Sequence, residues 1–227
     1  TALPQGPGAQ LDGTLQRVQS AGHMVVGTSA DYPPFEYYNE DFQLDGFDIA
    51  LMDEIARRLG VSVDYHDIAF EGLGSAIQNG QVDLAIAAIS ETPERAEVMD
   101  FTNVYYISED AFLAREDSAI TAVNATSDLT AWRLGVERGS IFEGWIEDTL
   151  VASGLIPQTN VFAYEKAGDA TRDLREQRLD LVVMDLPPRR PWLRDSSSSW
   201  GRGSTRSASP LPCPRVRTLC ARRSTAS

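Results

Sequence analysis

Three groups with complementary hydrogen-bonding chemistry follow one another closely at the end of an apolar segment. The carbonyl of Ala88, the hydroxyl of Ser90 and the guanidinium of Arg95 come after the apolar run at 83–88. A guanidinium fork binds a carboxylate through two parallel hydrogen bonds, and carbonyl and hydroxyl oxygens accept from an ammonium group. Together these groups match the two poles of a free α-amino acid. Arg95 can also be a surface residue that pairs with neighbouring acids.

A second group of polar residues lies later in the chain. Gly139, Ser140 and Ile141 are typical of a turn that leads into a helix, where the first N–H groups have no intrahelical acceptor and attract a carboxylate. Ser140 can also simply cap that helix. Asp185 ends the apolar segment 181–184, where its carboxylate either caps a following turn or neutralises a cation.

Aromatic side chains and acids accompany these segments. Tyr32 lies in the sequence Asp-Tyr-Pro-Pro-Phe at 31–35, and Phe70 precedes Glu71. Each ring can stack on a ligand or pack in the core. The acids Asp31 and Glu71 favour a polar or cationic ligand, although Asp31 can also be a solvated loop residue.

Residues for metal or nucleophilic chemistry are scarce. The two histidines, His23 and His66, are not beside a Ser or Cys nucleophile candidate, and the two cysteines are Cys213 and Cys220. We therefore expect no metal, no cofactor and no acyl-transfer triad. Acid–base catalysis by carboxylates stays an alternative.

Composition narrows the range of partners. The 227 residues carry 20 Lys and Arg against 33 Asp and Glu, which gives a net charge of −13. This charge repels phosphates and anionic lipids, so we expect no nucleic-acid partner. The sequence also lacks an apolar run long enough for a membrane-spanning helix.

Strand-like and helix-like patterns alternate along the chain. This order predicts an α/β protein with two lobes, joined through extended segments near 105–107 and 111–114, and a ligand cleft at the carboxyl ends of the strands. Asp48 is the predicted N-cap of one helix, and Gly60 is its predicted end. The predicted strands are 23–28, 61–65, 83–88, 132–136, 160–164 and 179–184, and the predicted helices are 48–59, 72–79, 140–151 and 169–177.

The predicted organisation has four parts. Residues 1–20 form a flexible leader, 21–113 the first lobe and 114–187 the second. Residues 188–227 are an anomalous basic tail, rich in Arg, Ser and Pro, for which we predict no packed structure. The tail is either a disordered extension or, as we favour, not the native continuation, for example through a shifted reading frame.

Four segments together resemble the extracytoplasmic solute-binding proteins of polar amino acid ABC transporters, bacterial solute-binding protein family 3. The similarity extends from about Met24 to Asp185 and implies a periplasmic-binding-protein-like type II fold of two lobes that close on a ligand. The segments are 27–36 with Tyr-Pro-Pro-Phe, 46–50 with Gly-Phe-Asp, 83–95 with Ser-x-Thr-Pro-Glu-Arg, and 100–102.

The resemblance also implies a role for each candidate residue. Arg95, the amide of Ser90 and donors near Ser140 would bind the α-carboxylate. Asp185, the carbonyl of Ala88 and the Ser90 hydroxyl would bind the α-ammonium, and two aromatic rings would flank the side chain. The candidate ligand-binding residues are Tyr32, Phe70, Ala88, Ser90, Arg95, Ser140, Ile141 and Asp185.

The implied function is to bind a free amino acid, polar or cationic, and to deliver it to the membrane subunits of an ABC permease. We expect a monomer without enzymatic activity, in the periplasm or elsewhere outside the cytoplasm, with the signal peptide removed and with or without a lipid anchor. The alternatives are an enzyme similar to cyclohexadienyl dehydratase and the ligand-sensing ectodomain of a receptor.

The sequence departs from the family pattern at two places. The family usually has Gly where this chain has Ala88, so a methyl group is expected to narrow the site. The family also continues beyond the position of Asp185 with a crossover back to the first lobe. The change in composition after residue 188 predicts that the first sheet keeps an uncovered edge.

Overall fold

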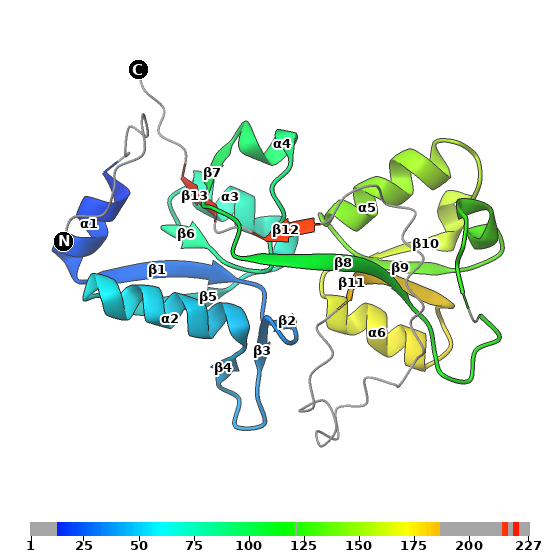
Figure 1. The fold of residues 1–227 in the computed structure, drawn as a ribbon, viewed down its shortest axis with the longest axis horizontal. Coiled ribbons are helices and arrows are strands. Elements are labelled where there is room, and N and C mark those ends of the chain that lie inside the picture. The colour runs from blue at the N-terminus through cyan, green and yellow to red at the C-terminus, as the bar shows by residue number, and fades with distance from the viewer. Residues whose placement is uncertain (1–12, 121, 187–214, 218–219, 223–227) are drawn as a thin grey trace.

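The computed structural model describes residues 13–120, 122–186, 215–217 and 220–222, which form two α/β lobes side by side (Figure 1). In each lobe a sheet lies between helices on its two sides. The order of elements agrees with the α/β class predicted from the sequence. The long strand β8 (Tyr106–Leu113) leads from the first lobe into the second.

The first lobe is built on a sheet whose described strands have the order β5-β1-β6-β13-β7. β1 pairs in parallel with β5 and β6, whereas β13 is antiparallel to β6 and β7. The strands are β1 (His23–Thr28), β5 (Ser62–Asp67), β6 (Leu84–Ala85), β7 (Met99–Phe101) and β13 (Cys220–Arg222). The helices are α1 (Thr14–Ala21), α2 (Phe47–Leu59), η1 (Phe70–Gly72), α3 (Leu73–Gln78) and α4 (Pro93–Ala96).

Apolar side chains cover both faces of this sheet. Val26 and Ile86 pack with Met52 of α2 on one face, and Leu73 and Ile77 of α3 pack on the other. α2 and α3 accordingly lie on opposite sides of the strands in Figure 1. Each fully buried side chain of this size stabilises the fold by roughly 1.5–3 kcal/mol.

Helix α2 ends where the sequence predicts and begins slightly differently. Gly60 follows it with a φ of 74°, a left-handed conformation that Gly adopts without steric cost. The N-cap is Gly46 rather than the predicted Asp48. Asp48 lies inside the first turn, and its side chain is turned towards the end of a neighbouring strand instead of capping its own helix.

The second lobe has a sheet whose described strands run in the order β10-β9-β11-β8-β12. β9 pairs in parallel with β10 and β11, and β8 is antiparallel to β11. The further strands are β9 (Leu134–Glu137), β10 (Val161–Tyr164), β11 (Leu181–Leu186) and β12 (Arg215–Arg217). The helices are η2 (Thr126–Leu129), α5 (Ile141–Trp145), its π-helical continuation η3 (Ile146–Val151), η4 (Gln158–Asn160) and α6 (Ala167–Arg175).

A small antiparallel sheet of β2 (Asp31–Tyr32), β3 (Glu36–Tyr38) and β4 (Leu44–Asp45) projects from the first lobe. The Pro-Pro turn joins β2 to β3 and places Tyr32 opposite Glu36. The amide of Phe47 donates to the carbonyl of Pro34 at 2.9 Å, which ties this sheet to the start of α2.

The boundaries of the lobes differ from the prediction. β8 lies within the range predicted for the first lobe, yet it pairs with β11, so the second sheet begins near residue 106. α1 begins within the predicted flexible leader and ends one residue beyond it. It is held by buried Val18 and by an ion pair from Arg17 to Asp83. Residues 1–12 lie outside the described range.

Two short stretches of the basic tail pair with the lobes. β13 lies between β6 and β7, and β12 pairs with β8. The predicted lack of packed structure in the tail and the predicted uncovered edge of the first sheet therefore differ from the structure. The rest of the tail lies outside the described residues, and its non-native origin stays a prediction.

Candidate ligand-binding cleft

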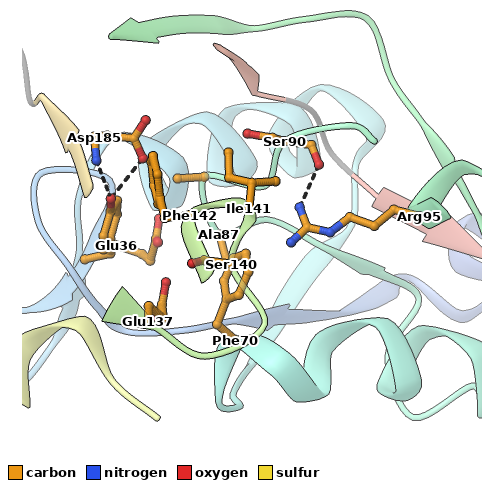
Figure 2. A pocket seen from close by; sticks show the side chains of 12 residues that line it. Glu36, Phe70, Ala87, Ser90, Arg95, Glu137, Ser140, Ile141, Phe142 and Asp185 are labelled. Carbon is orange, nitrogen blue, oxygen red and sulfur yellow. Dashed lines mark hydrogen bonds between the residues drawn. The ribbon is translucent and has the colours of Figure 1, made fainter. Parts of the chain in front are cut away.

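A cleft of about 330 Å³, including its open mouth, is lined by residues of both lobes (Figure 2). It lies at the ends of several strands and the starts of helices, as predicted for an α/β fold. All eight candidate residues from the sequence line it, together with four that sequence reasoning missed. The predicted residues are Tyr32, Phe70, Ala88, Ser90, Arg95, Ser140, Ile141 and Asp185, and the additional ones are Glu36, Ala87, Glu137 and Phe142.

Arg95 lies at one end of the cleft and bridges the two lobes. Its Nη1 donates to the carbonyl of Ser90 at 2.7 Å, and its Nη2 donates to the carbonyl of Gly139, in the second lobe, at 2.9 Å. The guanidinium carbon lies 5.4 Å from the centre of the Phe70 ring, within the range of a cation–π contact. Phe70 thus both lines the cleft and stabilises the guanidinium of Arg95.

The local sequence explains the position of Arg95. Thr92 is the N-cap of α4, its hydroxyl accepts from the amide of Arg95 at 3.2 Å, and Pro93 begins the helix. Pro suits the first helical position because its φ is already helical and no N–H is needed there. The Thr-Pro-Glu-Arg sequence therefore sets the direction in which the guanidinium leaves the helix.

Asp185 lies on the opposite side of the cleft in Figure 2 and is only 2% exposed. The hydroxyls of Tyr32 and Ser108 donate to its two carboxylate oxygens, at 2.9 and 2.5 Å. The Asp185 amide in turn donates to the Tyr32 hydroxyl at 3.1 Å. These neutral donors orient the carboxylate at the wall of the cleft, and a carboxylate held in this way is a suitable acceptor for a cationic group.

Tyr32 also connects the two lobes, because its hydroxyl joins the small sheet of the first lobe to β11 of the second. Its ring also stacks on Phe35, with centroids 6.2 Å apart. Ser108, on β8, holds Asp185 without lining the cleft. No spacing pattern in the sequence points to Ser108, because the β8–β11 pairing that brings it there is long-range.

Ala88 lines the cleft in an unusual backbone conformation. Its φ is 46°, in the left-handed region that L-residues other than Gly rarely adopt. The amide of Ala88 donates to Oδ2 of Asp48 at 2.8 Å. This turn ends the strand at Ala85, so the predicted strand 83–88 is shorter in the structure.

Ser140 and Ile141 lie at the turn between β9 and α5. The Ser140 hydroxyl accepts from the Glu143 amide at 3.3 Å and so caps the start of α5, and the Glu143 carboxylate accepts from the Gly139 amide, one residue before this N-cap, at 2.6 Å. Gly139 has a φ of 73°, and a Cβ there would lie 2.8 Å from that of Glu71. Gly is thus required for both the turn and the close approach of the lobes.

Two glutamates in the lining were not predicted. Glu36 begins β3 and is 1% exposed, and Glu137 ends β9. In Figure 2 both lie on the same side of the cleft as Asp185 and away from Arg95. Both are next to segments that we did single out. Glu36 follows Tyr-Pro-Pro-Phe and Glu137 precedes the Gly turn, so their positions beside a predicted site were the available signal.

Asp31 and Glu71, which the sequence offered as acids near a ligand, do not line this cleft. Asp31 accepts from the amide of Gly168 in α6 at 2.9 Å, and Glu71 lies 3.9 Å from Arg138. Burial is the main cause that raises the pKa of the Asp31 carboxyl above its ordinary value, and the Gly168 hydrogen bond partly opposes it. Both acids join the lobes instead.

The described residues include neither a candidate metal cluster nor a candidate membrane span. They contain no group of three or more His, Cys, Asp or Glu side chains placed to hold a metal ion. No helix within them combines the length and apolar character that a membrane crossing requires.

Two α/β lobes that share a cleft with a guanidinium and a carboxylate on its walls define the class of two-lobed solute-binding proteins. Comparison with known proteins identifies the family. The model of the bacterial extracellular solute-binding proteins, family 3, matches residues 24–205. The chain belongs to this family.

Several relatives have names that mention arginine. The chain is 30% identical over 162 residues to the arginine-binding extracellular protein ArtP of Bacillus subtilis, an alignment covering 71% of this chain and 60% of ArtP. It is 31% identical over 160 residues to an L-arginine-binding protein of Pseudomonas aeruginosa, covering 70% of this chain and 60% of that protein. The chain spans 60–64% of the length of ArtP and two further curated relatives.

Solved structures share the fold over most of the chain. The arginine-bound form of truncated ArgBP from T. maritima superposes with a TM-score of 0.75 and 28% identity, and the match covers 91% of each chain. This similarity agrees with the two-lobed fold predicted from the sequence.

Proposed function

We propose that the chain binds a free α-amino acid in the cleft between its lobes, without turnover, and delivers it outside the cytoplasm to the membrane subunits of an ABC permease. The observation that carries this proposal is the presence of Arg95 and Asp185 on the lining of one cleft. A zwitterion whose two charged groups meet these two side chains spans the cleft. Family membership supports the same function.

The α-carboxylate pole belongs at Arg95. In the structure the guanidinium donates to two neutral carbonyls, one of which, Gly139, lies in the second lobe. A ligand carboxylate is a stronger acceptor than a carbonyl and competes for these donors. The amide of Ile141, at the start of α5, adds a donor from the second lobe. The ligand then takes over a contact between lobes that the protein otherwise makes itself.

The α-ammonium pole belongs at Asp185. Its carboxylate is buried and oriented by Tyr32 and Ser108, so it offers a fixed negative charge rather than a mobile one. The carbonyl of Ala88 and the hydroxyl of Ser90 complete the set of acceptors. Hydrogen bonds to charged groups contribute about 1.5–3 kcal/mol each, so a few of them, less the ordering costs, give micromolar binding of about −8 kcal/mol.

The charge of the cleft favours an amino acid with a cationic side chain. Its described lining contains three carboxylates, those of Glu36, Glu137 and Asp185, against the guanidinium of Arg95. An α-amino acid brings one charge of each sign, and a cationic side chain adds the positive charge that a lining rich in carboxylates favours. The names of relatives such as ArtP agree with arginine as the ligand.

Closure follows from contacts that need both lobes. Only a state in which the lobes meet allows one ligand to contact Arg95 and Asp185 together, so the ligand favours that state by its differential affinity.

A thermal-shift screen of the twenty amino acids, followed by calorimetry on the best ligand, tests the proposal. We expect arginine or lysine to raise the melting temperature most, and Arg95→Ala to weaken binding by at least about tenfold through the loss of a charge-assisted pair. Arg57→Ala, which removes an exposed guanidinium paired with Glu54, is the control and leaves binding unchanged. No stabilisation by any amino acid, or equal affinity in the Arg95 variant, contradicts the proposal.

A further inference from the structure

One carboxylate oxygen joins the cleft to the segment that crosses between the lobes. Oδ2 of Asp48 accepts from the amide of Ala88 at 2.8 Å and from the hydroxyl of Tyr105 at 2.8 Å. We propose that Asp48 is a positioning residue, which holds the Ala88 turn in its left-handed form and links that turn to the crossing segment through Tyr105. The inference rests on the proposed function, because it assigns the Ala88 carbonyl to the ligand ammonium.

The Ala88 turn needs such support. In the left-handed region the methyl group of Ala approaches the following carbonyl oxygen, which makes this form less favourable than the right-handed one. The φ of 46° at Ala88 lies in this region. A hydrogen bond from its amide to a charged acceptor favours the conformation and fixes the direction in which its carbonyl points.

Asp48 is well placed to act as a fixed point. It lies in the first turn of α2, a helix of 13 residues, where the helix dipole favours a carboxylate. Its side chain is fully buried, and its own amide donates to the carbonyl of Phe35 at 2.9 Å. The carboxylate that holds Ala88 is therefore anchored to a helix rather than to a loop.

Tyr105 brings the link between lobes to the same oxygen. It lies between β7 of the first sheet and β8 of the second, in the segment that connects them. Its ring stacks on Phe47, with centroids 6.1 Å apart, next to Asp48 in sequence. Movement of the crossing segment changes the Tyr105 hydrogen bond and, through the shared oxygen, the support of Ala88.

The same helix provides a matched control. The hydroxyl of Tyr65 donates to Oδ1 of Asp53 at 2.8 Å, so α2 carries a second tyrosine–aspartate hydrogen bond of equal length. Neither Asp53 nor Tyr65 lines the cleft. Asp53→Asn and Tyr65→Phe remove the corresponding groups from a contact that does not touch the site.

Calorimetry with two probes distinguishes the loss of Ala88 positioning from a general loss of structure in the cleft. The probes are L-arginine and 5-guanidinopentanoic acid, which lacks the α-ammonium. We expect Asp48→Asn to raise the Kd for L-arginine about tenfold, as expected for a weakened contact to a charged group, and Tyr105→Phe to raise it less. The Kd for 5-guanidinopentanoic acid is expected to stay unchanged, and the Asp53 and Tyr65 variants to leave both values unchanged. Equal weakening of both probes, or no weakening, overturns the inference.

A glycine at residue 88 gives a second test. Because Gly adopts a positive φ as readily as a negative one, the turn no longer needs Asp48 in an Ala88→Gly background. We expect Asp48→Asn to cost less affinity for L-arginine there than in the parent chain. An equal cost in both backgrounds contradicts the positioning role.

The amide resonance of Ala88 decides the inference independently of any ligand. We expect Tyr105→Phe to shift the ¹H–¹⁵N signal of Ala88, and Tyr65→Phe to leave it in place. If the parent chain binds no amino acid, the proposed function fails, and this signal still decides the positioning role. If the Ala88 signal stays in place in the Tyr105→Phe variant, the positioning role of Asp48 is overturned.

Discussion

At the scale of single residues, the lining of the cleft has carboxylates on one side and the guanidinium of Arg95 on the other. Glu36 is nearly inaccessible to solvent and faces the cleft from the start of β3, beside Tyr32 in the small sheet. A buried carboxylate binds a cation more strongly than an exposed one, because less water screens the pair. If the proposed function holds, we expect Glu36 to contribute more to the binding of a cationic side chain than the acids on the surface do.

We expect Glu36→Gln to weaken binding of L-arginine about tenfold while binding of L-glutamine changes less, because the variant removes charge and keeps volume. Calorimetry with both amino acids measures the ratio. The control is Glu40→Gln, which makes the same substitution at an exposed residue that follows β3. A ratio that stays at the parent value excludes Glu36 from the recognition of the side chain.

The candidate residues were predictable from the sequence where one segment carried several groups together. Ala88, Ser90 and Arg95 lie within one such segment, and all line the cleft. Ser108 and Glu36 were not found, because each reaches its place through a pairing of strands or a turn that no local pattern encodes. The left-handed conformation of Ala88 was also hidden, since the hydrogen bond between its amide and Asp48 joins residues that are 40 positions apart in the sequence.

At the scale of secondary-structure elements, the turn between β9 and α5 controls how closely the lobes approach. Gly139 combines a left-handed φ with a position where a Cβ would come within 3.0 Å of the Glu71 backbone. Gly154 has a nearly identical φ of 74°, and a Cβ added there would have no atom within 4 Å. The two glycines thus share the backbone strain and differ in the contact between lobes.

We expect Gly139→Ala to lower the free energy of unfolding by roughly 1–3 kcal/mol more than Gly154→Ala, because only the first substitution overpacks a contact. Binding is expected to weaken as well, since the turn carries Ser140 into the cleft. Urea unfolding and calorimetry on both variants measure the two effects. Equal destabilisation by the two substitutions contradicts the role assigned to this contact.

The strand β13 gives a second prediction at this scale. It pairs with β6 and β7, so removal of residues 187–227 leaves facing edges of these two strands without their partner. We expect faster hydrogen exchange at the amides of β7 in the shortened chain, and unchanged exchange in β10, which lies far along the other sheet. Unchanged exchange in β7 contradicts the pairing.

Helices and strands with a regular spacing of apolar residues were predicted well, and short strands were not. β1 and the end of α2 agree with the sequence, because apolar spacing and Gly60 mark them. β2, β3 and β4 are too short to show a period. β8 was taken for a connection and its sheet was missed, because extended residues do not reveal their partner strand.

At the scale of the whole molecule, the lobes hold each other through contacts outside the ligand cleft. Asp31 accepts from the Gly168 amide, and Nζ of Lys166 lies 3.5 Å from Oδ2 of Asp67. The start of α6 is therefore bound to the first lobe. Tyr32 and Phe35 also share an apolar cluster with side chains of the second lobe. The ligand therefore adds to an interface that the protein already forms.

This interface predicts a dependence of stability on pH. Burial raises the pKa of Asp31 above its ordinary value of 3.8, so the folded state binds a proton more readily than the unfolded one. The contribution of Asp31 is then most favourable below that value and is lost as pH rises through the folded pKa. As pH rises from 3.8 through the folded pKa of Asp31, we expect the Asp31→Asn variant to become increasingly stable relative to the parent chain. Urea unfolding at several pH values measures this difference in the free energy of unfolding. A gain that is constant with pH contradicts this assignment.

The central claim is that one amino acid is held at its two poles by side chains on opposite walls of the cleft. Calorimetry of L-arginine, agmatine and 5-guanidinopentanoic acid on the parent chain, Arg95→Ala and Asp185→Asn tests it most directly. We predict that Arg95→Ala abolishes the preference for arginine over agmatine, which lacks the carboxylate, and that Asp185→Asn abolishes the preference over 5-guanidinopentanoic acid, which lacks the ammonium. Variants that keep both preferences of the parent chain would contradict the claim.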